Sequence, residues 1–599
     1  MENYDENATV YSPGIGKEQV IKATEILNSY KRAKANLERR IVENEEWWKM
    51  RHWELIRKKH TDDPEPASAW LFNSISNKHA DVMDNYPEPG ILPRSRDDIE
   101  AAKILSDIVP AVLEYNRFEE TYSDVWWYKL KNGTGCYGVF WNSSLCSGLG
   151  DIDIRGIDIL NVFWEPGIKD IQSSRNLFTV ELVDTDILEG MYPDLKGTLD
   201  TKVDIARYLY DDGVDTANKS AVVDWYYKKT VDGVQVLHYC KFVGTNVIYA
   251  SENDPLYQNT GYYNHGKYPF VFDPLFIEEG TPCGFGYIDV MKDVQMYIDK
   301  LNQIIIKNAL QAGKRRFFIS DNTGINEEEF ADWSKEFVHV AGNIDDRNIK
   351  EISVSQLDSG IVAVLNQKID ELKETSGNRD VSQGGVSGGV TAASAIAALQ
   401  EAGSKLSRDM IKGSYRAFKS INYLIIELMC QFYDDSRTFR ICSPEGGYSF
   451  VDFAGNLLAQ SWRNKQPVFD IYVTSQKSSP FSKTAQNELA KELYSAGVFD
   501  PRYASPALVC LEMMDFEGKN NIMAKVSENS ENHQLLQKLT EQNQKLKELV
   551  DMAYGSNISQ IEQEAPGEPS VESSTSKKPR LEDNFQGAAR LDAIRKTIG

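Results

Sequence analysis

The segment Ser376–Val390 reads SGNRDVSQGGVSGGV and separates two stretches of helical periodicity. It holds five glycines in 15 residues. Because each glycine loses much backbone entropy when it is ordered, this density predicts a flexible loop rather than a helix or a strand. After the loop, Thr391 has the residue type of a helix N-cap, and apolar residues recur at helical spacing to about residue 435.

Two shorter helical rods are expected before this loop. The first begins at Tyr287 and runs for about 26 residues, which corresponds to roughly 39 Å of α-helix. It ends at Gly313, before the basic cluster Lys314–Arg316. The second rod covers Gly360–Thr375. Between the rods we expect a small insertion with one short helix, Glu327–Glu336, and three short strands, Phe317–Ile319, Phe337–Val340 and Ile349–Ile352.

The order of rod, insertion, rod, glycine-rich loop and long helix resembles that of tailed-bacteriophage portal proteins, the head-to-tail connectors. Two stretches carry the resemblance most directly. One is the run GVTAASAI over Gly389–Ile396, followed by LQEAGSK over Leu399–Lys405. The other is Pro282 with Gly284-Phe285-Gly286, before a helix that contains Asp293, Asn302 and Asn308. The resemblance covers about residues 65–515, and the order of the parts carries more of it than any single motif.

This resemblance implies an α+β fold of the portal type, in which a mixed α/β wing, a two-helix stem and a small α/β clip are followed by a glycine-rich tunnel loop, a long wing helix and a helical crown. The expected parts are an N-terminal helical extension (1–64), the wing (65–280), the first stem helix (281–316), the clip (317–358), the second stem helix (359–376), the tunnel loop (377–390), the long wing helix (391–435), a small β wing element (436–480), the crown helices (481–520), and a C-terminal helix with a disordered tail (521–599).

Glycines 133, 135 and 138 match the dinucleotide-binding pattern G-x-G-x-x-G. That mechanism needs a strand before the glycines and a helix after them, so that the helix N-terminus can hold a pyrophosphate. Here a helical pattern precedes the glycines, and Tyr137–Trp141 reads as a strand. We therefore expect a helix-to-strand turn rather than a nucleotide site, and portal proteins have a similar Gly-Thr-Gly turn at this place.

The remaining chain is helical at its start and rich in strands in the middle. Residues 17–60 have helical periodicity, and Asn73–Asn85 predicts a helix that ends at the proline-rich Tyr86–Pro89. Residues 139–273 read mostly as short strands, with one helix over Thr185–Tyr192. After the long helix, a small β element is expected from three runs: Thr438–Ile441, Tyr448–Phe453 and Val468–Val473.

The C-terminal part has two helical patterns and a polar tail. Lys483–Ala496 and Pro506–Asp515 read as short helices. Leu535, Leu539, Leu546 and Leu549 match heptad positions over about two heptads, which is too few for an isolated coiled coil. Residues 555–584 are rich in Ser, Glu and Pro and read as disordered.

The overall charge limits how this chain contacts nucleic acid. The net charge is −23 and the pI is near 4.9, whereas a protein that grips duplex DNA over a broad face is basic. An acidic channel through which DNA slides is compatible with this sign, and so is an ordinary acidic soluble protein. The seven cysteines are scattered without CxxC spacing, which favours reduced thiols in a cytosolic protein. No run of about 18 apolar residues is present, so no membrane span is expected.

Signatures of catalysis are missing from the sequence. The seven histidines are spread singly, without H-E-x-x-H or a His/Cys cluster, so no metal site is expected. No Gly-Lys pair is followed by Ser or Thr, so the phosphate loop of nucleotide hydrolases is absent. We expect no enzyme activity and no cofactor.

The resemblance implies a structural role as a phage portal. Copies of the chain would form a ring of about twelve at one capsid vertex, with a channel for genome packaging and ejection. The implied partners are other copies of the chain, double-stranded DNA in the channel, the terminase large subunit, a head-tail adaptor, and the major capsid and scaffolding proteins, but no membrane. The implied location is the virion, and the host cytoplasm during assembly. Two alternatives stay open: another phage structural or scaffolding protein, or a nucleotide-dependent DNA-processing enzyme.

Three groups of candidate functional residues follow from this assignment. The tunnel-loop residues expected to face DNA are Arg379, Gln383, Gly384, Gly385, Gly388 and Gly389. The lysines that would add positive charge to the channel wall are Lys292, Lys300 and Lys307, whose alternative role is ion pairing between the rods with Asp289, Asp293, Asp299 and Asp370. The clip residues expected to dock partners are Phe317, Trp333 and Phe337.

Overall fold

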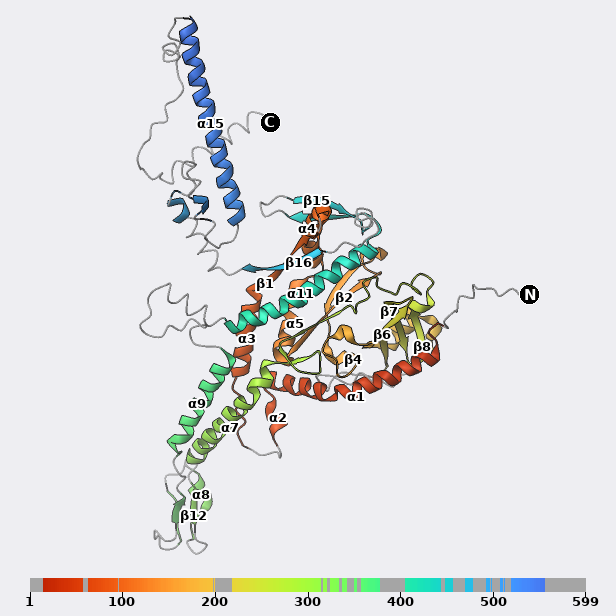
Figure 1. Ribbon diagram of the computed structural model, residues 1–599. Helices are drawn as coiled ribbons and strands as arrows, with labels where there is room; N and C mark the ends of the chain where they lie inside the picture. The colour runs from red at the N-terminus through yellow and green to blue at the C-terminus, as the bar shows by residue number, and fades with distance from the viewer. Residues whose placement is uncertain are drawn as a thin grey trace, which may run out of the picture. The chain divides into compact units, whose positions relative to one another are not determined.

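The computed structural model describes residues 14–57, 63–94, 96–197, 199, 218–313, 316–319, 324–332, 337–341, 349–352, 357–377, 405–442, 448–455, 469–477, 492–495, 497, 507–509, 511 and 519–554. The chain divides into two compact units, Met1–Ser478 and Ser479–Gly599. Both helices and strands are abundant in the first unit, which confirms the mixed α+β class (Figure 1).

Helix α1 (Lys17–Trp48) is long because apolar residues recur along one face of it and pack on a sheet. Four of them, Val20, Ala23, Leu27 and Tyr30, join a core cluster with strand residues such as Phe178. The short helix α2 (His52–Ile56) follows. The helical pattern predicted for residues 17–60 is therefore confirmed as far as Ile56, with a break between the two helices, and residues 58–60 lie outside the described residues.

The helix predicted over Asn73–Asn85 is confirmed by α3, but the chain directly after it is a strand. Helices α3 (Trp70–Met83), α4 (Ile99–Tyr115) and α5 (Phe118–Asn132) form the helical part of the first unit. The segment interpreted as a proline-rich exit instead lies in β1 (Asn85–Pro93), antiparallel to β16 (Phe469–Lys477). Pro87 and Pro89 fit this strand because they are two residues apart, so their missing N–H groups fall on the same side of it.

The strand-rich middle of the chain forms two antiparallel sheets. The first has the order β3-β2-β9, with β3 (Asp151–Gly156), β2 (Thr134–Asn142) and β9 (Phe270–Pro274). The second has the sequential order β4-β5-β6-β7-β8, with β4 (Val162–Trp164), β5 (Asn176–Asp184), β6 (Lys219–Val231), β7 (Val234–Val243) and β8 (Asn246–Ala250). The helix expected near residue 185 is α6 (Thr185–Met191).

The two rods are present as α7 (Tyr287–Gly313) and α9 (Ser359–Ser376), which pack on each other. Between them, β12 (Arg316–Ile319) pairs antiparallel with β13 (Ile349–Ile352), and α8 (Glu327–Ala331) is the short helix. The remaining predicted strand of this insertion, 337–340, forms only an isolated bridge between Val340 and Ile325. The last residues of the helix predicted over 327–336 lie outside the described residues.

Helix α11 (Lys405–Phe432) confirms the C-terminal two thirds of the predicted long helix, and residues 391–404 lie outside the described part. It lies beside β2 in the first unit (Figure 1) and also packs against β9. Residues of α11 such as Phe418, Ile425 and Met429 belong to the main apolar core.

The three strands predicted after this helix do not form one element. β14 (Arg437–Cys442) and β15 (Tyr448–Phe453) form a hairpin, while β16 pairs with β1, which lies almost 400 residues earlier in the chain. All three runs are strands, as their periodicity predicts, but periodicity alone does not choose a partner.

In the second unit, helix α15 (Lys519–Tyr554) is the longest described element. A small apolar cluster contains Leu493, Ala507, Leu511 and Val526. The heptad leucines further along α15 are exposed, with Leu535 at 60% and Leu546 at 57%. Most residues of the two predicted short helices, 483–496 and 506–515, lie outside the described residues.

Candidate functional site

Two glycine-bearing segments meet where helix α7 begins. Gly133 follows α5 with a φ of +91°, a left-handed conformation that suits glycine. A Cβ at Gly133 would lie 2.2 Å from the carbonyl carbon of Phe285, and a Cβ at Gly286 would lie 2.4 Å from the carbonyl oxygen of Lys131. The two backbones therefore touch with no room for side chains, and this contact explains the glycines in both segments.

Hydrogen bonds join the same two segments. The N–H of Gly284 donates to Thr134 Oγ1 at 2.7 Å, and the N–H of Leu275 donates to the carbonyl oxygen of Gly133 at 2.7 Å. The short strand β10 (Phe276–Ile277) pairs with β11 (Gly284–Phe285) immediately before α7. The turn after α5 and the chain leading into α7 thus form one bonded piece, which sets the direction of α7.

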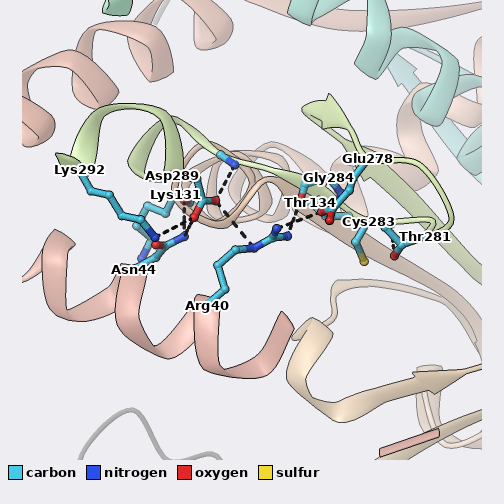
Figure 2. Close-up of polar contacts among 11 residues, drawn as sticks. Arg40, Asn44, Lys131, Thr134, Glu278, Thr281, Cys283, Gly284, Asp289 and Lys292 are labelled. Atoms are coloured by element: carbon cyan, nitrogen blue, oxygen red, sulfur yellow. Dashed lines mark hydrogen bonds and ion pairs between the residues drawn. The ribbon is translucent and has the colours of Figure 1, made fainter. Parts of the chain in front are cut away.

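Asp289 is the polar centre of this region, in the first turn of α7 (Figure 2). Its carboxylate accepts the Gly286 N–H at 3.0 Å and the Asn44 side-chain amide at 3.1 Å. Arg40 Nε lies 3.9 Å from this carboxylate, and Lys292 Nζ lies 3.4 Å from it. An acidic residue in the first turn also complements the helix dipole. Asp289 therefore caps α7 and connects it to α1.

Arg40 reaches from α1 to the chain before α7 (Figure 2). One guanidinium nitrogen donates to Glu278 Oε2 at 3.0 Å, and the other donates to the carbonyl oxygen of Gly284 at 2.8 Å. Arg40 therefore contacts Glu278 before the Gly284–Gly286 segment and Asp289 after it, so this one side chain spans the whole entry into α7. Since Arg presents a planar fork of donors, it suits a site where several acceptors must be held at fixed positions.

Residues 63–68, here called the strap, lie along one stripe of α7. Four α7 residues, each four positions apart and hence on one face, contact it: Gln295, Asp299, Gln303 and Lys307. Ser68 donates to Asp299 Oδ1 from its backbone N at 3.0 Å and from Oγ at 2.7 Å. Lys307 pairs with Asp63 at 2.9 Å.

Asp299 is also the buried partner of a histidine from α2. His52 Nε2 lies 3.0 Å from Asp299 Oδ2, and both side chains are almost fully buried. The imidazole stacks on Trp47 with ring centroids 4.3 Å apart. Helix α7 is thus held at its first turn by α1 and further along by α2 and the strap.

Helix α11 is held by two groups that each contain one Ser, one Asp and one Lys; the first is buried, whereas in the second the Asp81 side chain is half-exposed. Ser414 Oγ donates to Asp273 Oδ2 at 2.5 Å, and Lys129 Nζ lies 2.8 Å from the same oxygen. Nearer the start of the helix, Ser407 Oγ donates to Asp81 Oδ2 at 2.7 Å and accepts from Lys78 Nζ at 3.1 Å.

Burial lowers the pKa of both lysines, and the neighbouring carboxylates oppose that shift. Because an uncompensated charge in such a site is costly, these groups determine where α11 sits on α3, α5 and β9.

No metal centre is found in the part of the chain that the structure describes, where no three His, Cys, Asp or Glu residues are grouped as ligands. Among the described helices, none has the length and apolar character needed to cross a bilayer.

A family model described as "Phage P22-like portal protein" matches residues 80–566. The chain belongs to this portal protein family. No curated protein sequence matches the chain. The family match confirms the resemblance on which the sequence interpretation depends, and portal proteins are structural components of phage capsids rather than enzymes. The match begins at residue 80, so α1, α2 and the strap of this portal protein lie outside it.

The predicted lysines of the portal protein differ in their surroundings. Lys292 and Lys307 have carboxylate partners within the chain, Asp289 and Asp63. Neither pair joins the two rods, because Asp289 lies on the same helix as Lys292 and Asp63 lies in the strap. Lys300 Nζ lies 6.0 Å from the ring centroid of Tyr297.

Of the predicted docking residues, Phe337 is 74% exposed. Phe317 lies in β12, and Trp333 is outside the described residues. All of the predicted tunnel-loop residues are also outside the described part: Arg379, Gln383, Gly384, Gly385, Gly388 and Gly389.

Sequence reasoning named Asp289 and Asp299 only as possible ion-pair partners of the α7 lysines, and it did not anticipate the contacts that bind α7 and α11 to the body of the portal protein. The periodicity places Asp289 only on a polar helix face, although an acid three residues after Gly286 is the pattern of a first-turn cap. Arg40, Asp299 and Lys129 carry no such signal, because their ionic partners are between 144 and 249 positions away in the chain.

Proposed function

We propose that copies of this portal protein form a ring of about twelve at one capsid vertex, around a channel for genome packaging and ejection. In this assignment, α7 and α9 are the stem, and β12, α8 and β13 are the clip. The tunnel loop is 377–390, the wing is 65–280, and α11 belongs to the wing helix. The parts 436–480 and 481–520 are assigned as the small β wing element and the crown.

The observation that carries this proposal is the apolar surface that α7 and α9 leave uncovered in a single chain. Large apolar side chains on both helices are 41% to 55% exposed: Tyr297, Ile304, Leu310, Val362 and Val364. Burial of apolar surface contributes roughly 25 cal/mol per Å², so neighbouring copies gain free energy by standing side by side along these helices. Apolar patches of this kind on a soluble protein mark interaction surfaces.

Electron microscopy of the purified protein tests the ring. Wild type should give radial particles with a central hole. The double variant Ile304→Asp/Leu310→Asp should remain monomeric, because it places two charges on the proposed subunit contact. Val234→Asp is a matched control, since Val234 is 63% exposed at the start of β7 and lies outside the stem. Monomers of wild type at high concentration would refute the proposal.

The tunnel loop is proposed to follow the surface of moving DNA, with Arg379 and Gln383 as contacts and Gly384, Gly385, Gly388 and Gly389 as the flexible part. A glycine-rich loop adapts to a rotating duplex without a fixed lock. Deleting residues within Gly384–Gly389 should stop DNA packaging while rings still form, and normal packaging by such a variant would contradict this role.

The lysines of α7 are proposed to add positive charge to an acidic channel wall, with Lys300 as the principal candidate. Lys292 and Lys307 already have carboxylate partners, so their positive charge is partly compensated. Lys300→Gln should therefore change the ionic-strength dependence of DNA passage more than Lys292→Gln does. Equal effects of the two substitutions in a packaging assay would contradict this ranking.

The clip is proposed to dock the terminase large subunit and the head-tail adaptor through Phe317, Trp333 and Phe337. Exposed aromatic side chains are typical anchors of protein interfaces. Phe337→Ser should weaken terminase binding at least about tenfold in a pull-down titration, with rings unchanged. The proposed further partners are the major capsid and scaffolding proteins, and the proposed location is the virion vertex, with the host cytoplasm during assembly.

A further inference from the structure

A cavity of about 590 Å³ lies between α11, β9, β16 and the segment 169–172 of the first unit. Its floor is apolar and includes Phe270, Phe272, Leu424 and Ile471. Three lysines from three separate segments line it: Lys169, Lys267 and Lys419. We call this site the lysine recess. The combination of an apolar floor and a cationic lining fits a partner that is both apolar and acidic.

The charges of the lysine recess are only partly compensated within the chain. Lys267 Nζ lies 3.9 Å from the ring centroid of Tyr423, an interaction that orients the ammonium group. Lys267 also interacts electrostatically with Glu427, which compensates part of its charge. Lys419 is exposed on α11, and among the described contacts it has no carboxylate partner. Lys169 pairs with Glu279. Asp170 is the one acid among the lining residues that the structure describes.

This excess of positive charge contrasts with the whole chain. The sequence carries 89 acidic and 66 basic residues, for a net charge of −23. Copies of such a chain repel one another unless cationic sites on one copy meet acidic sites on the next. The lysine recess supplies a cationic site of this kind, and Pro282, at the entry into α7, also lines it.

We propose that the lysine recess receives an acidic, partly apolar surface segment of a neighbouring copy of this chain. The inference rests on the ring of the proposed function and identifies one of its contacts. Duplex DNA fits less well, because its phosphates match the lysines but not the floor of Phe and Leu side chains. A contact here joins the neighbouring copy to α11 and to the entry into α7 at the same time.

The first test is charge reversal at exposed positions. Lys267→Glu/Lys419→Glu should raise the protein concentration needed for half-maximal ring formation by on the order of tenfold or more, measured by light scattering after size exclusion. Lys267→Met/Lys419→Met should have a smaller effect. The control Lys103→Glu/Lys196→Glu makes the same change in net charge at exposed positions on α4 and after residue 195, and it should assemble like wild type.

The second test does not depend on the folding of a variant. Rings assembled from an equal mixture of ¹⁴N- and ¹⁵N-labelled wild type are treated with a carbodiimide, which links lysine ammonium groups directly to neighbouring carboxylates. Mass spectrometry should find peptides containing Lys267 or Lys419 of one label joined to an acidic peptide of the other label. Links within one label only, or no links at these lysines, would overturn the proposal.

The outcomes of these tests distinguish a failure of the lysine-recess proposal from a failure of the ring proposal. If wild type forms no ring, the proposed function itself fails. If wild type forms rings and the Lys267→Glu/Lys419→Glu variant forms them equally well, the ring stands and the lysine recess is not a subunit contact. If that variant assembles normally but loses affinity for a duplex oligonucleotide, the lysines belong to a DNA contact and the proposal is overturned.

Discussion

Gly133 and Phe285 approach so closely that a Cβ on Gly133 would lie 2.2 Å from the Phe285 carbonyl carbon. They come from two segments that both stand out as sequence motifs, the Gly-Thr-Gly turn and the Gly-Phe-Gly sequence before α7. Their contact gives the two motifs a single physical explanation: they are the two sides of one backbone crossing at the entry into α7.

Gly133→Ala should therefore destabilise the protein by about 3 kcal/mol or more, because a left-handed backbone and a steric clash both oppose the methyl group. Gly148 is a matched control, with a φ of +94° and nothing within 4 Å of the place that a methyl group would occupy. Gly148→Ala should cost only about 1 kcal/mol. Denaturant unfolding followed by circular dichroism measures both. Equal losses would mean that the clash is relieved by a backbone shift.

Asp289→Ala should destabilise the entry into α7, because it removes two hydrogen bonds and leaves Arg40 and Lys292 without this carboxylate. The expected loss is about 2 to 4 kcal/mol. Asp293→Ala, one turn further along α7 at an exposed position, should stay within about 0.5 kcal/mol of wild type. Hydrogen exchange of the α7 amides gives a local readout, and unchanged protection in Asp289→Ala would contradict the role of Asp289 as a cap.

Removing Lys129 alone should destabilise the protein more than removing Lys129 together with the charge of Asp273. Lys129→Met leaves Asp273 as a buried charge beside Ser414, at an expected cost of roughly 3 to 5 kcal/mol. In Lys129→Met/Asp273→Asn that charge is gone, so part of the loss should be recovered. Unfolding free energies of the two single variants and the double variant measure the coupling. Additive losses would show that the lysine and the aspartate act independently.

Acid should weaken the fold through His265. Burial, with a contribution from the charge of Lys267, lowers the pKa of His265 to about 3. Its Nδ1 accepts the Lys267 N–H at 3.0 Å, so it must be unprotonated in the fold. Below the ordinary pKa of about 6.5, the unfolded chain takes up a proton that the folded chain does not. The stability that this residue contributes is therefore present above about pH 6.5 and is lost as the pH falls toward 3.

His265→Asn tests this assignment, because the Asn side-chain oxygen replaces Nδ1 as an acceptor but does not titrate. Between about pH 6.5 and 4, wild type should lose up to about 3 kcal/mol more unfolding free energy than this variant. Measurements at a series of pH values, with buffers of equal ionic strength, give the two slopes. Parallel slopes would assign the acid sensitivity to other groups.

Local patterns in the sequence determined most of the elements of this protein. The helical spacing that begins with Tyr287 and Met291 continues to Ala312 and predicts α7 from one end to the other, because side chains three and four residues apart share a helix face. The inverted order of helix, glycines and strand at Gly133 excludes a nucleotide site. The order of rods, insertion and glycine-rich loop indicates the portal family, although the loop itself lies outside the described residues.

The tertiary structure decided which elements meet and which side chains lie between them. Sequence periodicity shows that β16 is a strand, but its pairing with β1 depends on how the intervening chain folds. In the same way, Arg40 pairs with Glu278 and Lys129 pairs with Asp273, although each pair is separated by more than 140 residues of sequence. An amphipathic pattern records which face of an element is buried, since that depends on neighbours within one or two turns. It does not record what covers that face, because the contacts are made only when distant segments pack together.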